Sequence, residues 1–404
     1  MRDTLLYISN NALLKDGSVN PFLSQEMPFL YALYNRVYII APQGVYIMNS
    51  ESELSCVRKT GWRDKFFAAV RGIFSARMIR ELIHMFKDRH FSVRDMARLA
   101  LFSVSGIRIY RLLQKAAGGL DKTKCCLYSY WLSYDAYAAA LAQKKWPEYR
   151  SAARAHSYDI QLVRNSCNPY LMKRFIGRHI QDIHFISNCA KQEFSEYMNL
   201  DSLKANLHIT YLGSSLRDTG WRPLEEGRNT YRILSCSYLV PIKQVHHIIE
   251  ALSGWNGRAL EWVHIGDGPL KQELELLAKK MLDSNPQVEY RFAGILTNDR
   301  TREIMREGFD CFINCSKVEG VPVSIMEALS FGIPVIAPKI NGIPELVDED
   351  CGILYEPVDE KTGLMKLLEN FFQRSHGERQ EMRRAAYEKW NGQFVLDCNI
   401  QKVI

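Results

Sequence analysis

The chain has 404 residues, of which 47% are hydrophobic and 24% are charged, close to the average of soluble globular proteins. This composition excludes a disordered, collagen-like or low-complexity chain, and the length favours two domains of roughly 150–200 residues. The formal net charge of +7 is uneven: residues 58–124 hold 16 Lys and Arg against 5 Asp and Glu, so the rest of the chain is mildly acidic.

Short apolar segments rich in β-branched and aromatic residues recur along the first half of the chain. They predict strands at residues 4–9, 35–44, 124–133, 182–187 and 207–213. Residues 62–117 instead predict two or three helices inserted into the order of the strands. A region without apolar periodicity, residues 213–230, is rich in turn residues, and we expect it to be the linker between the domains.

The second half alternates more regularly between strands and amphipathic helices, which predicts βαβ units and a parallel sheet. The expected strands are residues 231–237, 261–266, 288–294, 309–316, 334–339 and 351–355. The fold class is therefore α/β, with two Rossmann-like domains whose parallel sheets face a ligand cleft. We expect residues 1–212 to form the first domain, residues 213–385 the second, and residues 386–404 a helix that packs back on the first.

The cysteines and the N-terminal segment point to a reducing compartment. The ten cysteines form no C-x-x-C pair and no Cys/His cluster at zinc spacing, a pattern typical of buried apolar residues. The segment MRDTLLYISN lacks the features of an export signal, and the chain has no apolar run of about 18–20 residues. We therefore expect a cytoplasmic location and no spanning helix.

The densest pattern is SKVEGVPVSIMEALSFGIPVIAPKINGIPEL, residues 316–346. Gly320 lets the backbone approach a ligand closely, and Pro322 pre-sets the first turn of a helix. The free N–H groups at such a helix start suit a diphosphate. Glu319 stands at the mouth of this helix, and Glu327, eight residues further along, is spaced to reach the other end of an elongated polyhydroxyl ligand.

This segment resembles the E-x7-E signature of family-4 (group 1) glycosyltransferases, E-G-x-P-x-x-x-x-E-A-x-x-x-G-x-P-V-I-A. The likeness spans about residues 205–360 and includes NGIPELV (341–347), CGILYEPVD (351–359), VHIGDGPLKQELE (263–275) and LSCSYLVPIK (234–243). The first half is similar more loosely, through ARAHSYD (153–159) and FISNCAKQEF (185–194). The resemblance implies a GT-B fold, with the sugar donor bound by the second domain and the acceptor by the first.

The resemblance also implies roles for individual residues. Glu319 would contact the transferred sugar, Glu327 would bond the donor ribose, and Lys243 would neutralise the diphosphate leaving group. His156 is similar to an acceptor-domain histidine that points into the cleft, and Arg154 is a further candidate beside it. The implied donor-binding backbone comprises Gly320, Val321, Pro322, Val323 and Ser324, together with glycine turns at Gly266, Gly268, Gly294 and Gly17.

One position departs from the family pattern. Five residues before Lys243, where the family usually has an arginine, this sequence has Tyr238. A phenol donates one hydrogen bond but brings no charge. Either another basic residue reaches the diphosphate, with Arg217 and Arg232 nearby in the sequence, or the helix dipole contributes more to stabilising its charge.

By the same resemblance the chain is expected to be a retaining glycosyltransferase of the EC 2.4 class that needs no metal or other cofactor. It would move a sugar from a UDP- or GDP-sugar to a glycan or lipid-linked acceptor in cell-surface polysaccharide synthesis. Two alternatives stay open: a GT-B sugar-nucleotide epimerase and a non-catalytic sugar-nucleotide-binding protein.

The basic residues 62–117 combine spaced arginines with apolar stripes. This pattern predicts peripheral contact with an anionic membrane, at the inner face of the cytoplasmic membrane. The alternative is that the stripes pack on the domain core while the arginines are merely solvated. Nucleic-acid binding is not expected, because no recognised reader motif accompanies the basic segment.

Overall fold

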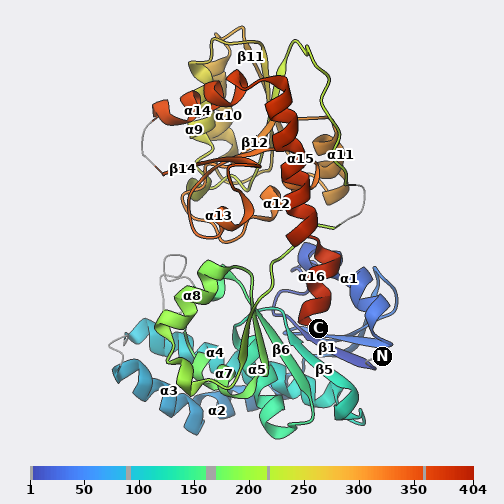
Figure 1. Cartoon of the computed structure of the whole chain (residues 1–404). Coiled ribbons are helices and arrows are strands. Elements are labelled where there is room, and N and C mark those ends of the chain that lie inside the picture. Colours follow the sequence, from blue (N-terminus) through green and yellow to red (C-terminus); the bar gives the residue numbers. More distant parts are fainter. Residues whose placement is uncertain (1–2, 88–91, 161–169, 216–218, 358–360) are drawn as a thin grey trace. The chain divides into compact units, whose positions relative to one another are not determined.

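The computed structural model describes residues 3–87, 92–160, 170–215, 219–357 and 361–404 (Figure 1). The chain forms two compact units. The first extends to Thr210 and also includes Ile400–Ile404, and the second comprises Tyr211–Asn399. Each unit is built on its own sheet flanked by helices, which confirms the predicted α/β class.

The first unit contains an eight-stranded sheet in the order β4-β3-β2-β1-β5-β6-β7-β8. All neighbouring strands are parallel except β2–β3 and β3–β4, which are antiparallel. The order runs outward from β1 in both directions, so it reverses between β1 and β5. The strands are β1 (Thr4–Ile8), β2 (Arg36–Ala41), β3 (Gly44–Met48), β4 (Leu54–Lys59), β5 (Cys125–Ser129), β6 (Arg150–Ala155), β7 (Asp182–Phe185) and β8 (Asn206–Ile209).

Helices cover both faces of this sheet. Leu6 and Ile8 of β1 join one core cluster, and Leu5 and Tyr7 join the other, because successive strand residues point to opposite faces. The prediction for residues 62–117 is confirmed, since three of the helices lie there. The helices are α1 (Pro21–Leu33), α2 (Trp62–Ile73), α3 (Ala76–Lys87), α4 (Val93–Ala116), α5 (Tyr134–Lys145), α6 (Ser157–Ile160), α7 (Lys173–His179) and α8 (Asn188–Tyr197).

Three strands of the first unit, β3, β4 and β6, were not predicted from the sequence. The β4 segment LSCVRK lies at the sheet edge and is mostly exposed, so it lacks a clear apolar alternation. The β6 segment RSAARA is buried but contains no β-branched or aromatic residue, the types that mark strands. Packing between β5 and β7 overrides its weak local preference.

The second unit contains a six-stranded parallel sheet in the order β11-β10-β9-β12-β13-β14, which reverses between β9 and β12. All six predicted strands are confirmed: β9 (Tyr231–Cys236), β10 (Leu260–Ile265), β11 (Val288–Gly294), β12 (Cys311–Ile313), β13 (Val335–Pro338) and β14 (Gly352–Tyr355). The helices are α9 (His246–Ser253), α10 (Lys271–Leu282), α11 (Asn298–Arg306), α12 (Val323–Ser330), α13 (Ile343–Leu346), α14 (Lys361–Gln373) and α15 (His376–Gln393). None of the helices in the described ranges of either unit has the length and hydropathy needed to span a bilayer.

The second unit extends further towards the C-terminus than the expected boundary at residue 385. On α15, the buried Trp390 donates a hydrogen bond from its indole to Ser214 Oγ at 2.7 Å. Of the final helix α16 (Leu396–Val403), only residues from Ile400 onward belong to the first unit, where Ile400 and Val403 join the core cluster of α1. Residues 386–399 therefore complete the second unit, and only residues 400–404 return to the first.

The expected linker, residues 213–230, is not a separate connection between the two units. Leu224 exchanges backbone hydrogen bonds with the side chain of Gln380 on α15, at 3.3 and 3.0 Å. The part of the linker region that the structure describes beyond residue 218 is thus held to the second unit. The linker region lacks apolar periodicity because it follows an extended path along the surface of that unit.

Candidate functional site

Lys243 and Glu319 meet at the carboxyl edge of the second sheet. Lys243 ends a single 3-10 turn, Pro241–Lys243, that follows β9, and Glu319 lies in the loop that follows β12. Because β9 and β12 are the neighbours between which the strand order reverses, these two loops flank the switch point of the sheet. Open α/β sheets bind their ligands at this kind of position.

The two side chains form an ion pair. Lys243 Nζ donates a hydrogen bond to Glu319 Oε1, and the Asn314 amide donates to the same oxygen at 3.4 Å. Glu319 is only 4% exposed, and a buried carboxylate needs such a partner to stay charged. The ammonium has three N–H donors, so it can meet an anion while keeping its orientation.

Glu327 lies on α12, just over one turn after the helix begins at Val323. Glu319 lies in the loop four residues before the first residue of α12, at the mouth of the helix as predicted. Burial raises the pKa of Glu327 to about 7, opposed by the charge of Arg302. Burial also raises the pKa of the Cys236 thiol to about 12, with Glu327 raising it further and Lys243 lowering it, so both charges lie near the end of β9.

The start of α12 has the form that the motif predicted. Pro322 is the residue before the first helical turn, with φ −70° and ψ 118°, and the helix opens with Val323 and Ser324. The first N–H groups of a helix have no partner within it and favour an anion. The loop before α12 is held in place by Gly342, whose N–H donates to Gly320 O at 3.1 Å. The two segments pack closely, because a Cβ on Gly342 would lie 2.5 Å from that oxygen.

The predicted glycine turns of the second unit come together beside the Lys243 turn. Gly266 N–H donates to Gly294 O at 3.0 Å, and both have positive φ, +143° and +72°. A Cβ on Gly266 would lie 1.9 Å from Ser237 O, and one on Gly268 would lie 2.5 Å from Leu239 O. The loop after β10 therefore packs on the loop after β9 so closely that only glycine fits. Gly17, in the first unit between β1 and α1, has φ +88° but open space around it, so the turn alone requires glycine there.

His156 follows β6 in the first unit and is buried. Its Nε2 lies 3.0 Å from Tyr130 O, and its ring centroid lies 4.3 Å from that of Trp131. Burial, with the charge of Arg154, lowers its pKa to about 3, so the imidazole is neutral at physiological pH and Nε2 carries the proton that faces the carbonyl. Arg154 itself is held in the core by Glu26, at 2.6 Å between Nη1 and Oε1.

The structure narrows the search for a base that replaces the missing arginine at Tyr238. Arg232 lies at the start of β9, at the opposite edge of the sheet, and pairs with Glu261 and Glu307, so it is not that base. Arg217 lies outside the described residues. Lys271, which was not singled out from the sequence, starts α10 directly after the G-D-G-P turn and pairs with Asp267 at 3.3 Å.

No group of three or more His, Cys, Asp or Glu in the described ranges is placed to hold a metal ion. Metal independence was expected from the resemblance and not from geometry. It therefore stays a prediction.

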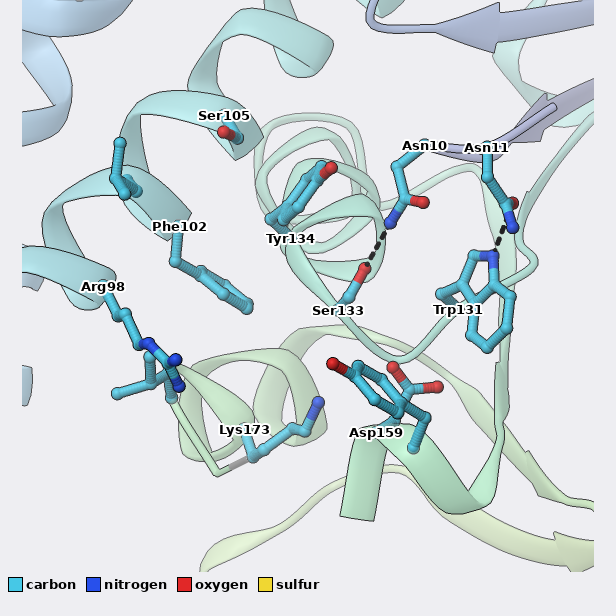
Figure 2. A pocket seen from close by; sticks show the side chains of 13 residues that line it. Asn10, Asn11, Arg98, Phe102, Ser105, Trp131, Ser133, Tyr134, Asp159 and Lys173 are labelled. Carbon is cyan, nitrogen blue, oxygen red and sulfur yellow. Dashed lines mark hydrogen bonds between the residues drawn. The ribbon is translucent and has the colours of Figure 1, made fainter. Parts of the chain in front are cut away.

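The first unit has a cavity that was not predicted from the sequence. Its volume is about 490 Å³, within the range of roughly 300–1,000 Å³ typical of small-molecule sites. It lies where the order of the first sheet reverses, between the loops after β1 and β5 (Figure 2). Its polar lining includes Asn10, Asn11, Ser133, Asp159 and Lys173.

The second unit matches a known family, and curated relatives match parts of the chain. Residues 222–389 match the model of the family "Glycosyl transferases group 1". The putative colanic acid biosynthesis glycosyltransferase WcaL of Escherichia coli is 26% identical over 201 residues, 47% of this chain and 48% of that protein. The amylovoran biosynthesis glycosyltransferase AmsK of Erwinia amylovora is 28% identical over 161 residues, 38% of this chain and 37% of that protein. The alignments thus span about half or less of these relatives.

Solved structures match the whole chain in fold. Sucrose-phosphate synthase from Thermosynechococcus elongatus has a TM-score of 0.69 at 12% identity, covering 99% of this chain and 97% of that chain. Anabaena HepE in complex with UDP-glucose has a TM-score of 0.63 at 14% identity, covering 99% and 98%. The fold is the expected GT-B fold, and its second unit contains the segment that the glycosyl transferases group 1 model matches.

Proposed function

We propose that this chain is a retaining glycosyltransferase of the family-4 type, moving a sugar from a UDP- or GDP-sugar to a glycan or lipid-linked acceptor. The observation that carries the proposal is the ion pair of Lys243 with the buried Glu319 at the switch point of the second sheet. The relatives WcaL and AmsK support a role in cell-surface polysaccharide synthesis, because both are named for polysaccharide biosynthesis.

In this proposal the diphosphate of the donor lies at the start of α12, beside Lys243. Negative charge grows on the diphosphate as the glycosidic bond breaks, and a fixed cation stabilises that charge by about 3 kcal/mol or more. Glu319 accepts hydrogen bonds from hydroxyls of the transferred sugar, and Glu327 accepts them from the ribose. Lys243 and the helix start supply the positive charge without a metal.

A donor screen followed by a turnover assay tests the proposal. A panel of nucleotide sugars is screened by thermal shift, because a ligand in excess stabilises the folded state. The radiolabelled donor that binds is then incubated with lipid and glycan extracts. We expect label in an acceptor product, lost in Glu319→Ala and kept in the control Lys339→Ala, whose side chain is 58% exposed.

Two other results would contradict transfer. Conversion of the donor to a free epimerised sugar would indicate an epimerase. Donor binding without turnover, unaffected by Glu319→Ala, would indicate a non-catalytic binding protein.

We also propose that the first unit lies on an anionic membrane through α2 and α3. Trp62, Phe66, Phe74 and Ile79 are 72%, 59%, 79% and 55% exposed, whereas Ala68, Met78 and Met85 of the same helices pack in the core. Only one face of each helix is therefore used by the core. Exposed aromatic and aliphatic side chains between basic residues suit the interface of an anionic bilayer.

The charges on these two helices support the same partner. Their sequence holds six Lys and Arg but only two acids, Asp64 and Glu81, and both acids are buried. Asp64 pairs with Lys115 and Arg111 of α4, and Glu81 accepts a hydrogen bond from Met172 N–H at 2.7 Å. The net charge that faces solvent is therefore positive.

Vesicle flotation tests the membrane proposal. Binding is expected to vesicles containing phosphatidylglycerol, to be weak with phosphatidylcholine alone, and to fall at least tenfold in the double variant Phe66→Ser/Phe74→Ser. The control is Leu276→Ser/Ile295→Ser, which removes apolar side chains of similar exposure, 68% and 77%, from the second unit. Equal binding to both lipids, or by both double variants, would contradict the proposal.

A further inference from the structure

The cavity of the first unit combines a cationic wall with an apolar wall. Lys173 and Arg98 point into it, from the start of α7 and from α4, as Figure 2 shows. Apolar and aromatic groups from α4 and from the loop after β5 line the rest, among them Leu101, Phe102 and Trp131. A ligand that fills this space meets positive charge on one side and apolar surface on the other.

Lys173 is the least expected of these residues, because it is only 2% exposed. Within the described ranges its ammonium makes no hydrogen bond and no ion pair. Burial lowers the pKa of Lys173 to about 8, opposed by the charge of Asp159, so the side chain is still mostly charged at pH 7. A buried ammonium without a partner is unfavourable, and an anion in the cavity would remove that penalty.

Asp159 acts on Lys173 through its charge but makes no hydrogen bond or ion pair with it among the described residues, because one oxygen of its carboxylate is already engaged. Its Oδ2 accepts hydrogen bonds from Leu132 N–H at 3.1 Å and from His156 N–H at 3.0 Å. The carboxylate thereby ties the loop after β5 to the loop after β6. Asp159 therefore shapes the cavity and offsets the charge of Lys173 only in part.

The polar groups of the loops after β1 and β5 are largely satisfied by one another. The Asn10 amide donates to Ser133 Oγ at 3.3 Å, and the Trp131 indole donates to Asn11 Oδ1 at 2.8 Å (Figure 2). Arg98, like Lys173, has no hydrogen-bond or ion-pair partner among the described residues. Both cations that line the cavity are therefore without a partner among the described residues.

We propose that this cavity binds the phosphate or carboxylate of an amphiphilic acceptor, with Lys173 as its counter-ion and Arg98 as a second contact, while Phe102 and its neighbours hold an apolar body. Naming the ligand an acceptor rests on the proposed function. The anion site itself rests only on the cavity and its two cations.

Three probes separate the parts of this proposal in titration calorimetry with the full chain. Octyl phosphate offers both the anion and the apolar body, inorganic phosphate offers only the anion, and octyl glucoside offers an uncharged head on the same tail. We expect octyl phosphate to bind at least tenfold more tightly than either of the others. Equal affinity for octyl phosphate and octyl glucoside would overturn the proposal.

Variants locate the binding. Lys173→Met is expected to weaken octyl phosphate at least tenfold, and Arg98→Ala several-fold. The matched control is Arg94→Ala, which lies one turn earlier on α4, is exposed and does not line the cavity. Circular dichroism checks the fold of each variant. Unchanged affinity in a folded Lys173→Met, or an equal loss in Arg94→Ala, would overturn the site.

A transfer assay then separates this proposal from the proposed function. If the cavity holds the acceptor, Lys173→Met raises the acceptor KM while the donor KM stays unchanged. If turnover is absent but octyl phosphate binding still depends on Lys173, transfer fails and the anion site stands. If turnover occurs with an unchanged acceptor KM in Lys173→Met, transfer stands and the acceptor assignment of the cavity fails.

Discussion

The two sheets place a lysine beside the point where the strand order reverses, but they treat it in opposite ways. In the second unit Lys243 is partly exposed and paired with the buried Glu319. In the first unit Lys173 is almost fully buried, and its ammonium has no ion pair among the described residues. The switch point of the second sheet thus holds a satisfied cation, whereas the cavity at the switch point of the first sheet is lined by an unsatisfied one.

The two sites are therefore prepared for a ligand in different ways. Pairing holds Lys243 in one orientation before the proposed donor arrives, as transition-state stabilisation requires. Lys173 instead carries a desolvation penalty that Asp159 offsets only in part and that a bound anion would relieve further. A paired site is built for chemistry, whereas an unpaired site favours tight retention of a charged group.

The largest effect is expected where a buried pair of the first unit is broken. Glu26→Ala leaves Arg154 buried without its partner and removes the acceptor of the Tyr7 hydroxyl, 2.9 Å away. The free energy of unfolding should fall by about 3–5 kcal/mol in urea denaturation. Glu303→Ala, which breaks an exposed pair with Arg300, should change it by less than about 1 kcal/mol. Similar values for the two variants would show that pairing in this core has little effect.

The second effect concerns the paired lysine. Lys243→Ala should lower kcat by roughly 10²–10³-fold, because it removes a fixed cation from the leaving group, while the donor KM changes much less. Steady-state turnover of the donor identified by the screen measures both constants. Full activity in this variant, with Lys339→Ala also active, would remove Lys243 from the proposed diphosphate contact.

The third effect is a pH dependence set by Glu327. Because burial raises its pKa to about 7, the carboxylate is mostly protonated at pH 6 and mostly ionised at pH 8. Donor affinity should therefore rise over this interval and then level off. Glu327→Gln should weaken donor binding about tenfold at pH 8 and abolish the rise. A rise that persists in the Gln variant would assign the titration to another group.

The smallest expected effect is a change in the free energy of unfolding that has opposite signs for the two lysines. Lys173→Met should raise the free energy of unfolding by about 1 kcal/mol at pH 7, because it removes an unpaired buried charge. Lys243→Met should lower it, because Glu319 loses its partner in a buried position. Exposed Lys144→Met is the control. Changes of the same sign at both lysines would contradict the comparison.

The difference in stability between the wild type and Lys173→Met should change with pH in one direction. The pKa of Lys173 is lowered in the folded state, so between about 8 and 10.5 the unfolded chain binds more protons than the folded one. The contribution of Lys173 to stability therefore rises with pH above about 8. Denaturation of wild type and Lys173→Met from pH 7 to 9.5 should show the advantage of the variant shrinking.

The second unit was largely predictable because its chemistry is concentrated in contiguous sequence. The alternation of strands and helices predicted its sheet, and the segment containing Glu319 and Gly320 predicted the loop after β12. The ion pair with Lys243 joins residues 76 positions apart, so spacing alone did not predict it. Spacing also did not show that Arg232 lies at the opposite edge of the sheet from Lys243.

The cavity of the first unit was not predicted, because its members come from five separate segments. Asn10, Arg98, Trp131, Asp159 and Lys173 meet only when the loops after β1, β5 and β6 converge with α4 and α7. Each residue alone is ordinary in its local sequence. One signal was available: Lys173 lies in the mostly apolar segment YLMKRFI, where a charged residue that becomes buried needs a reason.

Cys236, at the end of β9, gives the proposed donor site an unexpected chemical property. Its pKa of about 12 leaves a thiolate fraction on the order of 10⁻⁵ at neutral pH, and only the thiolate reacts with electrophiles and oxidants. A sulfur nucleophile next to Lys243 and Glu327 is thus kept inert. Alkylating reagents and peroxide should spare this site while they modify the exposed Cys56 and Cys398, so that labelling at Cys236 would report opening of the donor loops.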